Sequence, residues 1–234
     1  MMARLPRITP AGMPVHVIQR GNNRQVCFAS DDDHVAYTGW LKEYSKKCEV
    51  AIHAWVQMTN HVHLLCTPRR DGAVSKMMQG LGRRYVQYFN YQYRRSGTLW
   101  EGRFKSCLVQ EIDYLLQLYR YIEFNPVRAG MVSDPGEYRW SSYQVNALGK
   151  RSDLCTAHQE YLDLGREVME RQFNYRALFA YQVEGELLEE IRENTNKGMA
   201  IGHDRFKEEI EKLIGRRVIP KKRGRLVGWR KQGI

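Results

Sequence analysis

The stretch VAIHAWVQMTNHVHLLCT, residues 50–67, decides the fold. Two apolar runs rich in β-branched residues are separated only by Thr59 and Asn60, and this spacing predicts a tight β-hairpin. The second run opens with two histidines one residue apart, His61 and His63. Side chains at i and i+2 of a strand point to the same face, so the two imidazoles should lie side by side.

The segments around the hairpin predict an α+β fold. We expect strands at 14–20, 50–58, 61–67 and 103–110, and helices at 31–48, 73–95 and 111–125. The order β-α-β-β-α-β-α is that of the ferredoxin-like or split βαβ fold, an antiparallel sheet with helices on one face.

The character of the chain changes after this fold. Residues 1–150 are the expected main domain, and residues 151–214 are expected to form a helical extension. Gly215, the next residue, is the expected C-cap of its last helix. Residues 215–234 hold eight basic residues and no acid, so we expect a basic tail.

Charge and cysteine content limit the class of protein. Lys and Arg total 37 against 26 Asp and Glu, a formal net charge of +11, so the first partner to consider is a polyanion; a solvated basic surface is the alternative. The five cysteines are scattered without a CxxC pair, which indicates reduced thiols rather than disulfides or a zinc ribbon. Neither an apolar run of about 18 residues nor a signal-peptide core is found, so we expect a cytoplasmic protein without a membrane span.

The histidine pair has two interpretations at this point: an incidental pair, or ligands of a metal site. The helix expected at 111–125 bears on that choice. Its apolar stripe, predicted to pack on the sheet, consists of Ile112, Leu115, Leu116, Tyr119 and Ile122. Tyr121 and Asn125 fall on the opposite side, where Tyr121 is either an ordinary half-exposed aromatic or a functional group. Pro126 disfavours a helical conformation for Asn125, which should lie at a frayed helix end.

Residues at i and i+4 are neighbours on a helix, so the Tyr121 phenol and an amide oxygen can approach one point. If that point also faces the histidines, two imidazoles, an amide oxygen and a phenol surround a cation. Such a set, completed by water and phosphate oxygens, suits Mg²⁺ or Mn²⁺ better than structural zinc. This arrangement requires His61 and His63 on the strand face turned towards the tyrosine helix, with Val62 and Leu64 on the other.

Five words of the sequence, in order, resemble one known family. They are RGNNRQVCF (20–28), QMTNHVHLL (57–65), GTLWEGRFKS (97–106), YIEFNPVRAGMV (121–132) and RWSSY (139–143). With the His-x-His pair and the later helix tyrosine, the chain resembles the REP-associated tyrosine transposases, a single-tyrosine, IS200-like branch of the HUH nuclease superfamily. The resemblance covers roughly residues 14–145, and the segment after 150 matches more loosely.

The resemblance implies a site and an activity. His61 and His63 would be metal ligands, Asn125 the third ligand and Tyr121 the nucleophile, with Mg²⁺ or Mn²⁺ as cofactor. Members of the family cut and rejoin single-stranded DNA near palindromic repeat hairpins, through a 5′-phosphotyrosine and a free 3′-OH. The implied protein is a metal-dependent DNA transposase and endonuclease that acts on nucleoid DNA in the cytoplasm, as a monomer or homodimer.

The candidate DNA contacts are basic or polar groups in four segments. They are Arg20 and Asn22 after the first strand, Arg83 and Arg84 on the long helix, Arg103 and Lys105 on the last strand, and Lys221, Lys222 and Arg223 in the tail. Cations neutralise phosphates, and contacts to the backbone give affinity without sequence readout. Arg103 and Lys105 lie at i and i+2 of a strand and share one face, so they are the better phosphate candidates.

Two other classes of function stay open. A ferredoxin-like sheet with aromatic side chains also serves non-catalytic binding of single-stranded DNA or RNA. A metal nuclease that uses water would cut without a covalent intermediate. Four polar positions favour the strand transferase, because a binding protein has no need for all of them together: His61, His63, Tyr121 and Asn125.

Overall fold

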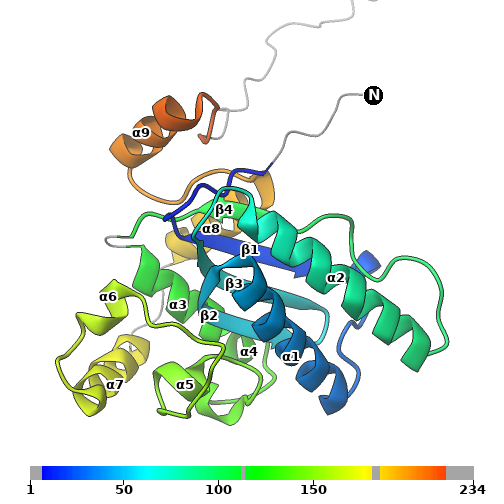
Figure 1. Ribbon diagram of the computed structural model, residues 1–234. Helices are drawn as coiled ribbons and strands as arrows, with labels where there is room; N and C mark the ends of the chain where they lie inside the picture. Colours follow the sequence, from blue (N-terminus) through cyan, green and yellow to red (C-terminus); the bar gives the residue numbers. More distant parts are fainter. Residues whose placement is uncertain (1–6, 112–113, 181–184, 220–234) are drawn as a thin grey trace, which may run out of the picture.

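The computed structural model describes residues 7–111, 114–180 and 185–219, and one four-stranded sheet lies at its centre (Figure 1). The strands pair in the order β2-β3-β1-β4, and every pairing is antiparallel. They are β1 (Val15–Arg20), β2 (Val50–Met58), β3 (His61–Pro68) and β4 (Lys105–Leu108). The predicted fold class, α+β with a ferredoxin-like antiparallel sheet, is confirmed.

The hairpin predicted at 50–67 is present. Thr59 and Asn60 alone join β2 to β3, and Met58 pairs with His61 directly across the turn. A two-residue connection fixes the register of a hairpin, and the register fixes which side chains share a face. The local sequence is therefore sufficient to place both histidines on one side of the sheet.

The C-terminal extension forms backbone hydrogen bonds with the outer edge of the sheet at the end of β4. The strand is shorter than the predicted 103–110, and beyond it Gln110 donates its backbone N–H to the carbonyl of Ile201 (2.9 Å). Ile201 in turn donates to the carbonyl of Leu108 (2.8 Å). These bonds cover part of an edge that would otherwise present unpaired backbone groups.

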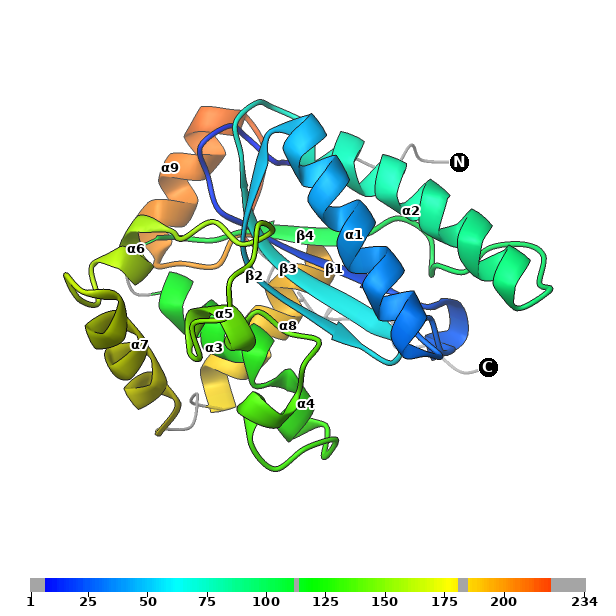
Figure 2. The same ribbon diagram turned by 60° about the horizontal axis from the view of Figure 1, so that its bottom comes forward.

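Helices α1 (Asp31–Cys48) and α2 (Ala73–Gln92) cover one face of the sheet (Figures 1 and 2). A Cβ on Gly80 would lie 2.4 Å from the ring of Tyr44, so glycine at this position allows the two helices to approach closely. α2 ends at Gln92 rather than at 95, because the chain turns at Arg94, whose φ is 49°.

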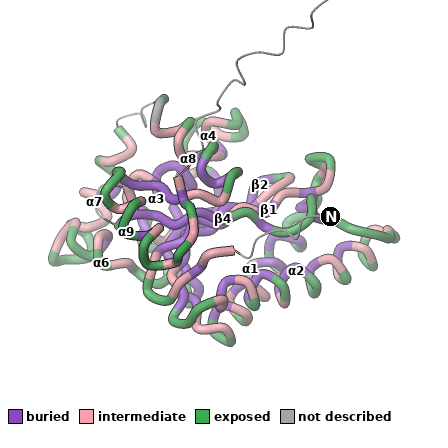
Figure 3. The backbone as a smooth tube through the Cα atoms, turned by 90° about the horizontal axis from the view of Figure 1, so that it is seen from above, coloured by how far each residue is buried: buried purple, intermediate pink, exposed green. Residues whose placement is uncertain are grey.

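The opposite face is covered by α3 (Leu115–Glu123), α4 (Asn125–Arg128) and α8 (Gly185–Lys197), as Figure 2 shows. α3 contacts β2 and β3, whereas α8 contacts β4 and β1. The helix pair of the ferredoxin-like unit thus lies on one face, as predicted, and later segments cover the other. The strands are buried between these layers, while the outer sides of α1 and α2 are exposed (Figure 3).

The predicted orientation of α3 is wrong. Tyr119, expected to pack on the sheet, instead packs on Tyr161 and Tyr175 of the extension, with ring centroids 6.4 and 6.1 Å away. Tyr121, expected opposite the apolar stripe as either a half-exposed aromatic or a functional group, is 5% exposed and faces the sheet. α3 lies between the sheet and the extension, so both of its sides are buried and an apolar stripe does not identify the sheet side. Ile112 of that stripe lies outside the described residues.

The remaining elements are short. They are the 3₁₀ turns η1 (Asn22–Arg24), η2 (Pro135–Glu137) and η3 (Leu178–Ala180), and the helices α5 (Tyr143–Asn146), α6 (Gln159–Leu162), α7 (Val168–Ala177) and α9 (Asp204–Ile214). α9 ends at Gly215 in the left-handed conformation (φ 61°), which confirms the expected C-cap. Ile210 and Val218 join the core formed with α1 and α2, so the extension packs on the main domain.

The basic tail from residue 220 onward lies outside the described residues. Residues 220–234 contain Lys221, Lys222 and Arg223, and these three predicted DNA contacts therefore lie outside the described residues. Within 7–111, 114–180 and 185–219, no helix is long and apolar enough to cross a lipid bilayer.

A buried carboxylate joins α3 to the segments behind it. Glu123 is fully buried and accepts hydrogen bonds from Ser142 (2.5 Å), Asn146 (2.8 Å) and Tyr175 (2.6 Å). Burial raises the pKa of Glu123 to about 7, and these three donors offset part of that effect. Ser142 also accepts from the backbone N–H of Trp55 on β2 (2.8 Å), so one network connects the sheet, α3, α5 and α7.

We expect Tyr175→Phe to lower the free energy of unfolding by about 1–3 kcal/mol, because it leaves a buried carboxylate oxygen of Glu123 without its donor. Urea unfolding followed by circular dichroism measures this change. Tyr91→Phe is the control and should leave stability unchanged, since Tyr91 is 86% exposed. Equal stability of the two variants would show that the Glu123 network does not hold the extension on α3.

Candidate functional site

Strand β3 carries both histidines on the face turned towards α3. The ring centroids of His61 and His63 are 5.0 Å apart, and the ring of His63 lies 5.6 Å from that of Tyr121 on α3. Val62 and Leu64 are fully buried in the opposite core, with α1 and α2. The distribution of side chains predicted for β3 is therefore confirmed.

Hydrogen bonds fix the ring of His61. Its Nδ1 lies 2.6 Å from Oδ1 of Asn60, whose Nδ2 donates to the carbonyl of Arg24 (3.1 Å). This second bond orients the amide, so Oδ1 of Asn60 accepts and Nδ1 of His61 donates. The neutral ring then keeps its lone pair on Nε2, which is the nitrogen left for a ligand.

His16 on β1 is a third histidine of the site, and sequence reasoning missed it. Its Nε2 lies 2.8 Å from Nδ1 of His63, and the two rings stack with centroids 5.1 Å apart. The ring of Tyr121 is 5.8 Å from that of His16. The only available signal was the alternation of β1, which becomes informative once β1 is known to pair with β3.

Burial keeps the three imidazoles neutral. It lowers the pKa of His16 to about 3 and that of His61 to about 4, where the positive charge of Arg20 adds to the effect. It also holds the pKa of His63 well below the usual value, with smaller contributions from the neighbouring histidines and from Arg128. Neutral imidazoles have lone pairs available for a cation.

Tyr121 presents its phenol to this group of rings. No described residue hydrogen-bonds to the Tyr121 hydroxyl, whereas Tyr175 on the extension donates its own hydroxyl to a carboxylate. The phenol of Tyr121 is therefore positioned by packing against His16 and His63 and keeps its hydrogen-bonding capacity for a reaction partner.

Arg128 is a second residue that sequence reasoning missed. Its guanidinium lies 4.4 Å from the centroid of the Tyr121 ring, and its Nη2 donates to the Tyr121 carbonyl (2.5 Å). The break between α3 and α4 at Phe124 turns the chain so that Arg128 returns to Tyr121. Its Nη1 is buried and has no hydrogen-bond partner among the described residues, and burial lowers the pKa of Arg128 to about 10. A buried donor without a partner suits an anion next to the tyrosine.

α3 ends at Glu123, and Asn125 is the first residue of α4, followed by Pro126. Asn125 is therefore helical, and the prediction of a frayed helix end at this residue is wrong. No hydrogen bond or ring contact joins Asn125 to the histidines among the described residues. Its Nδ2 is buried, and no residue in the described part of the chain hydrogen-bonds to it. Because the two ends of an amide exchange by a simple rotation, the atom in this position is available as either a donor or an oxygen ligand.

The site offers the imidazole nitrogens of His61 and His63 to a cation, and Asn125 stays the predicted third ligand. The described ranges contain no group of three or more His, Cys, Asp or Glu side chains placed to hold a metal ion. A closed zinc site of such ligands is therefore not found there. The donors present fit a cation that takes most of its ligands from water and substrate oxygens.

Strand register places two of the predicted DNA contacts on the histidine face. Arg20 pairs directly with His61 across β1 and β3. Ile18 pairs with His63 on one side and with Lys105 on the other, so Lys105 lies in the same row as His63. Directly paired residues of antiparallel strands point to the same face, so both cations lie on the side of the imidazoles.

The structure does not bring Arg83 and Arg84 to this face, because α2 covers the other one. Nη1 of Arg84 donates to both carboxylate oxygens of Glu43 on α1 (2.9 and 2.8 Å), and its guanidinium lies 5.1 Å from the Trp40 ring centroid. Arg84 therefore links α1 to α2. Asn22 lies in η1, directly after β1.

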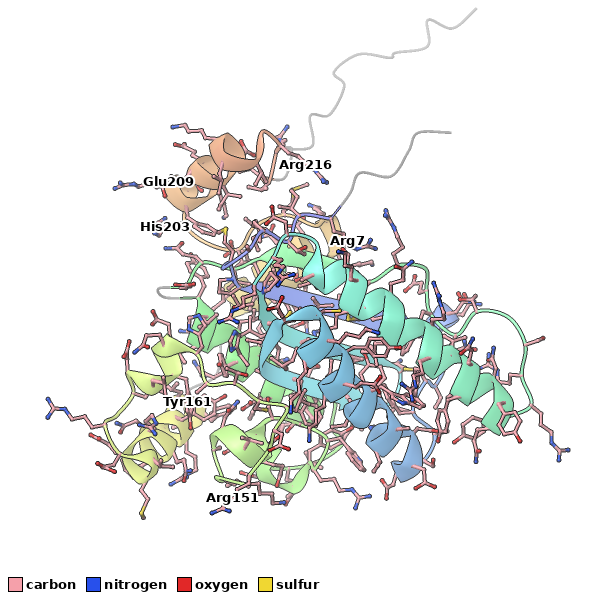
Figure 4. All side chains as sticks on the ribbon, in the orientation of Figure 1. Arg7, Arg151, Tyr161, His203, Glu209 and Arg216 are labelled. Carbon is pink, nitrogen blue, oxygen red and sulfur yellow. The ribbon has the colours of Figure 1, made fainter. Side chains whose placement is uncertain are left out.

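A basic cleft of about 530 Å³ lies beside the edge strand β4. Its cationic lining consists of Arg7, Arg103, Lys105, Lys197 and Arg216, of which Figure 4 labels Arg7 and Arg216. Cys107 and Thr195 also line it, and both contact His16 behind them. The cleft and the imidazoles are thus separated by one layer of side chains.

The fold and these side chains define a class of protein: a ferredoxin-like α+β domain that presents imidazoles, a phenol and a buried guanidinium at one point of its sheet. Residues 11–125, from β1 to the start of α4, match the model of the family described as "Transposase IS200 like". Over these residues the chain matches an IS200-like transposase domain, which agrees with the resemblance to IS200-like transposases stated from the sequence.

Two solved structures are similar to the chain. One is described as a REP-associated tyrosine transposase bound to a REP hairpin; it is 17% identical, covers 67% of this chain and 93% of its own, and has a TM-score of 0.51. This likeness supports the fold. The other, from Deinococcus radiodurans R1 and described as a proposed transposase, is 21% identical, covers 53% of this chain and 94% of its own, and has a TM-score of 0.36. No match was found among curated proteins.

Proposed function

We propose that the protein is a metal-dependent DNA strand transferase that cuts and rejoins single-stranded DNA beside hairpins, with Tyr121 as nucleophile. One observation carries this proposal: the Tyr121 ring lies 5.6 Å from His63 and beneath the guanidinium of Arg128. A phenol used only for packing needs neither a cation nor paired imidazoles beside it.

The proposed metal ligands are Nε2 of His61, Nε2 of His63 and the amide oxygen of Asn125. The hydrogen bonds made by Nδ1 of each ring and the partnerless amide atom of Asn125 support this set. When bound there, Mg²⁺ or Mn²⁺ would place positive charge next to a non-bridging oxygen of the scissile phosphate.

In the proposed reaction, Tyr121 is the only side chain that becomes covalently bonded to the DNA. The phenolic oxygen of Tyr121 attacks phosphorus, the bond from phosphorus to the 3′ oxygen breaks, and the 5′ side becomes a phosphotyrosine. The phenol loses one proton to solvent, and the departing 3′ oxygen gains one. One phosphoester bond replaces another, so a free 3′-OH can reverse the step and rejoin strands.

Arg128 has two parts in this mechanism. A fixed cation 4.4 Å from the ring of Tyr121 attracts the negatively charged scissile phosphate to the phenol. Its buried Nη1, which has no partner within residues 7–111, 114–180 and 185–219, can donate to a phosphate oxygen that enters the site. Both effects increase as negative charge develops during transfer.

The substrate we propose is single-stranded DNA carrying a hairpin, in the cytoplasm. The similar transposase described with a REP hairpin supports the hairpin, and the cations around the histidines support a phosphate backbone. Arg20, Arg103 and Lys105 are the proposed contacts, and Asn22 lies next to Arg20. The tail cations Lys221, Lys222 and Arg223 stay predictions for the hairpin stem, and monomer and homodimer stay the two expected oligomeric states.

We expect Tyr121→Phe to abolish a covalent protein–DNA adduct, by at least about 10³-fold, because it removes the nucleophile. Labelled single-stranded hairpin DNA is incubated with the protein and Mg²⁺ or Mn²⁺, and the adduct is detected on a denaturing gel. Tyr119→Phe is the matched control: it lies on the same helix, faces the extension, and should keep the adduct.

The other outcomes identify other functions. Cleavage that survives Tyr121→Phe excludes the tyrosine mechanism and indicates a nuclease that uses water. Binding without cleavage under any divalent metal indicates a non-catalytic DNA or RNA binding protein. Chelation of the metal should remove both cleavage and adduct, while a chelator-resistant adduct would exclude the proposed metal dependence.

We also expect the cations to separate into two groups by their effect on binding. Arg103→Ala should weaken DNA binding and reduce the slope of log affinity against log salt by about 0.7, as loss of one phosphate contact on a single strand does. Arg84→Ala should leave the slope unchanged, because its guanidinium is held by Glu43. Fluorescence anisotropy across a salt series measures both. Equal slopes for the two variants would show that the cleft does not hold the backbone.

A further inference from the structure

We propose that helix α8 of the C-terminal extension is part of the catalytic site: Thr195, through His16, holds His63 in the tautomer that leaves Nε2 free. This inference rests on the proposed role of His63 as a metal ligand. It assigns to Thr195 and His16 the part of positioning residues, and it gives the extension a function beyond packing.

The observation is an unbroken chain of hydrogen bonds from α8 to β3. The Thr195 hydroxyl donates to the carbonyl of Ile191, one turn earlier in α8 (2.7 Å). Nδ1 of His16 lies 2.9 Å from the same hydroxyl oxygen, and Nε2 of His16 lies 2.8 Å from Nδ1 of His63. Three segments far apart in the sequence, β1, β3 and α8, meet in this chain.

The direction of the chain follows from counting donors. A hydroxyl has one hydrogen to donate and two lone pairs to accept with. The hydrogen of Thr195 goes to Ile191, so Nδ1 of His16 must carry the proton and donate to the hydroxyl oxygen. The sulfur of Cys107, 3.2 Å from that oxygen, supplies a second donor, and every capacity of the hydroxyl is then used.

The tautomer of His63 follows in turn. A neutral His16 protonated on Nδ1 has its lone pair on Nε2, where it accepts from Nδ1 of His63. A neutral His63 protonated on Nδ1 has its lone pair on Nε2. His61 reaches the same tautomer by a different route, through Asn60, so both rings present the same nitrogen.

The reverse arrangement would disable the ligand. If Thr195 donated to His16, then Nε2 of His16 would donate to His63, and the proton of His63 would lie on Nε2. Both arrangements fit the same heavy-atom positions, and the bond from Thr195 to Ile191 selects between them. A residue that hydrogen-bonds to the non-ligating nitrogen of a metal-binding histidine typically contributes about 10–100-fold to metal affinity.

Burial makes the selection strict. His16, His63, Cys107 and Thr195 are 1%, 2%, 2% and 3% exposed, so their polar atoms depend on one another for hydrogen bonds. α8 is held in place by contacts with β4 and β1, and Asn196 accepts a hydrogen bond from Lys105 on β4 (3.0 Å). The extension therefore presents a fixed acceptor to His16.

The test compares Thr195→Val, which removes the hydroxyl at similar volume, with Thr195→Ser, which keeps it. In metal-free, full-length protein with nitrogen-15 in its histidine rings, the chemical shifts separate protonated from bare nitrogens. We expect the His63 proton on Nδ1 in the wild type and in Thr195→Ser, and on Nε2 in Thr195→Val, where the thiol of Cys107 is the remaining donor to His16. His63→Gln identifies the signal by its loss.

A second measurement is the affinity for Mn²⁺. We expect Thr195→Val to weaken Mn²⁺ binding by about 10–100-fold and Thr195→Ser to restore it to about the wild-type value. A merely structural Thr195 would lower the unfolding midpoint without moving the His63 proton, and this outcome would overturn the proposal. So would Mn²⁺ affinity of Thr195→Val within about twofold of the wild type.

Two further results are informative. If Thr195→Val does not fold, Thr195→Ala removes the same acceptor without added bulk, and the same shifts decide the question. If the wild type forms no adduct with any metal, the proposed function fails, whereas a His63 proton that moves in Thr195→Val still supports the positioning chain from α8.

Discussion

The antiparallel pairing of β1 with β3 is the constraint on which the site depends. It sets Ile18 opposite His63 and Arg20 opposite His61, and it brings His16 within hydrogen-bonding distance of His63. A slip of one residue would turn His16 into the core formed with α1 and α2. Because both strands lie in the middle of the sheet, apolar packing on both faces opposes such a slip.

The burial of α3 on two sides positions the phenol. Helices on a sheet usually leave one side to water, but here the extension covers α3 and Glu123 fastens it to α5 and α7. The side of α3 that carries Tyr121 therefore packs against the imidazoles. The turn at Phe124 places the Arg128 guanidinium over the Tyr121 ring. A phenol held this way would need little reorganisation to act as the proposed nucleophile.

Local rules predicted the hairpin and the face shared by His61 and His63, since both follow from a two-residue loop and the strand period. The side of α3 that meets the sheet was not predictable, because aromatic residues cover both of its sides. His16 and Arg128 were missed for another reason. Their roles depend on strand order and on a turn between helices, which are non-local and leave no spacing pattern in the sequence.

The proposed ligand set has a thermodynamic consequence. Two imidazoles and one amide leave several of the six positions that Mg²⁺ prefers to other oxygens, and the described part of the chain supplies no cluster of acidic or thiol ligands to fill them. Arg20 and Arg128, close enough to affect the protonation of His63, also repel a lone divalent cation. A DNA phosphate offsets that repulsion and adds oxygen ligands, so metal and DNA should each strengthen the binding of the other by the same factor. Under this proposal the DNA would complete the metal site, and the part left to the protein would be to keep Nε2 of His61 and Nε2 of His63 unprotonated.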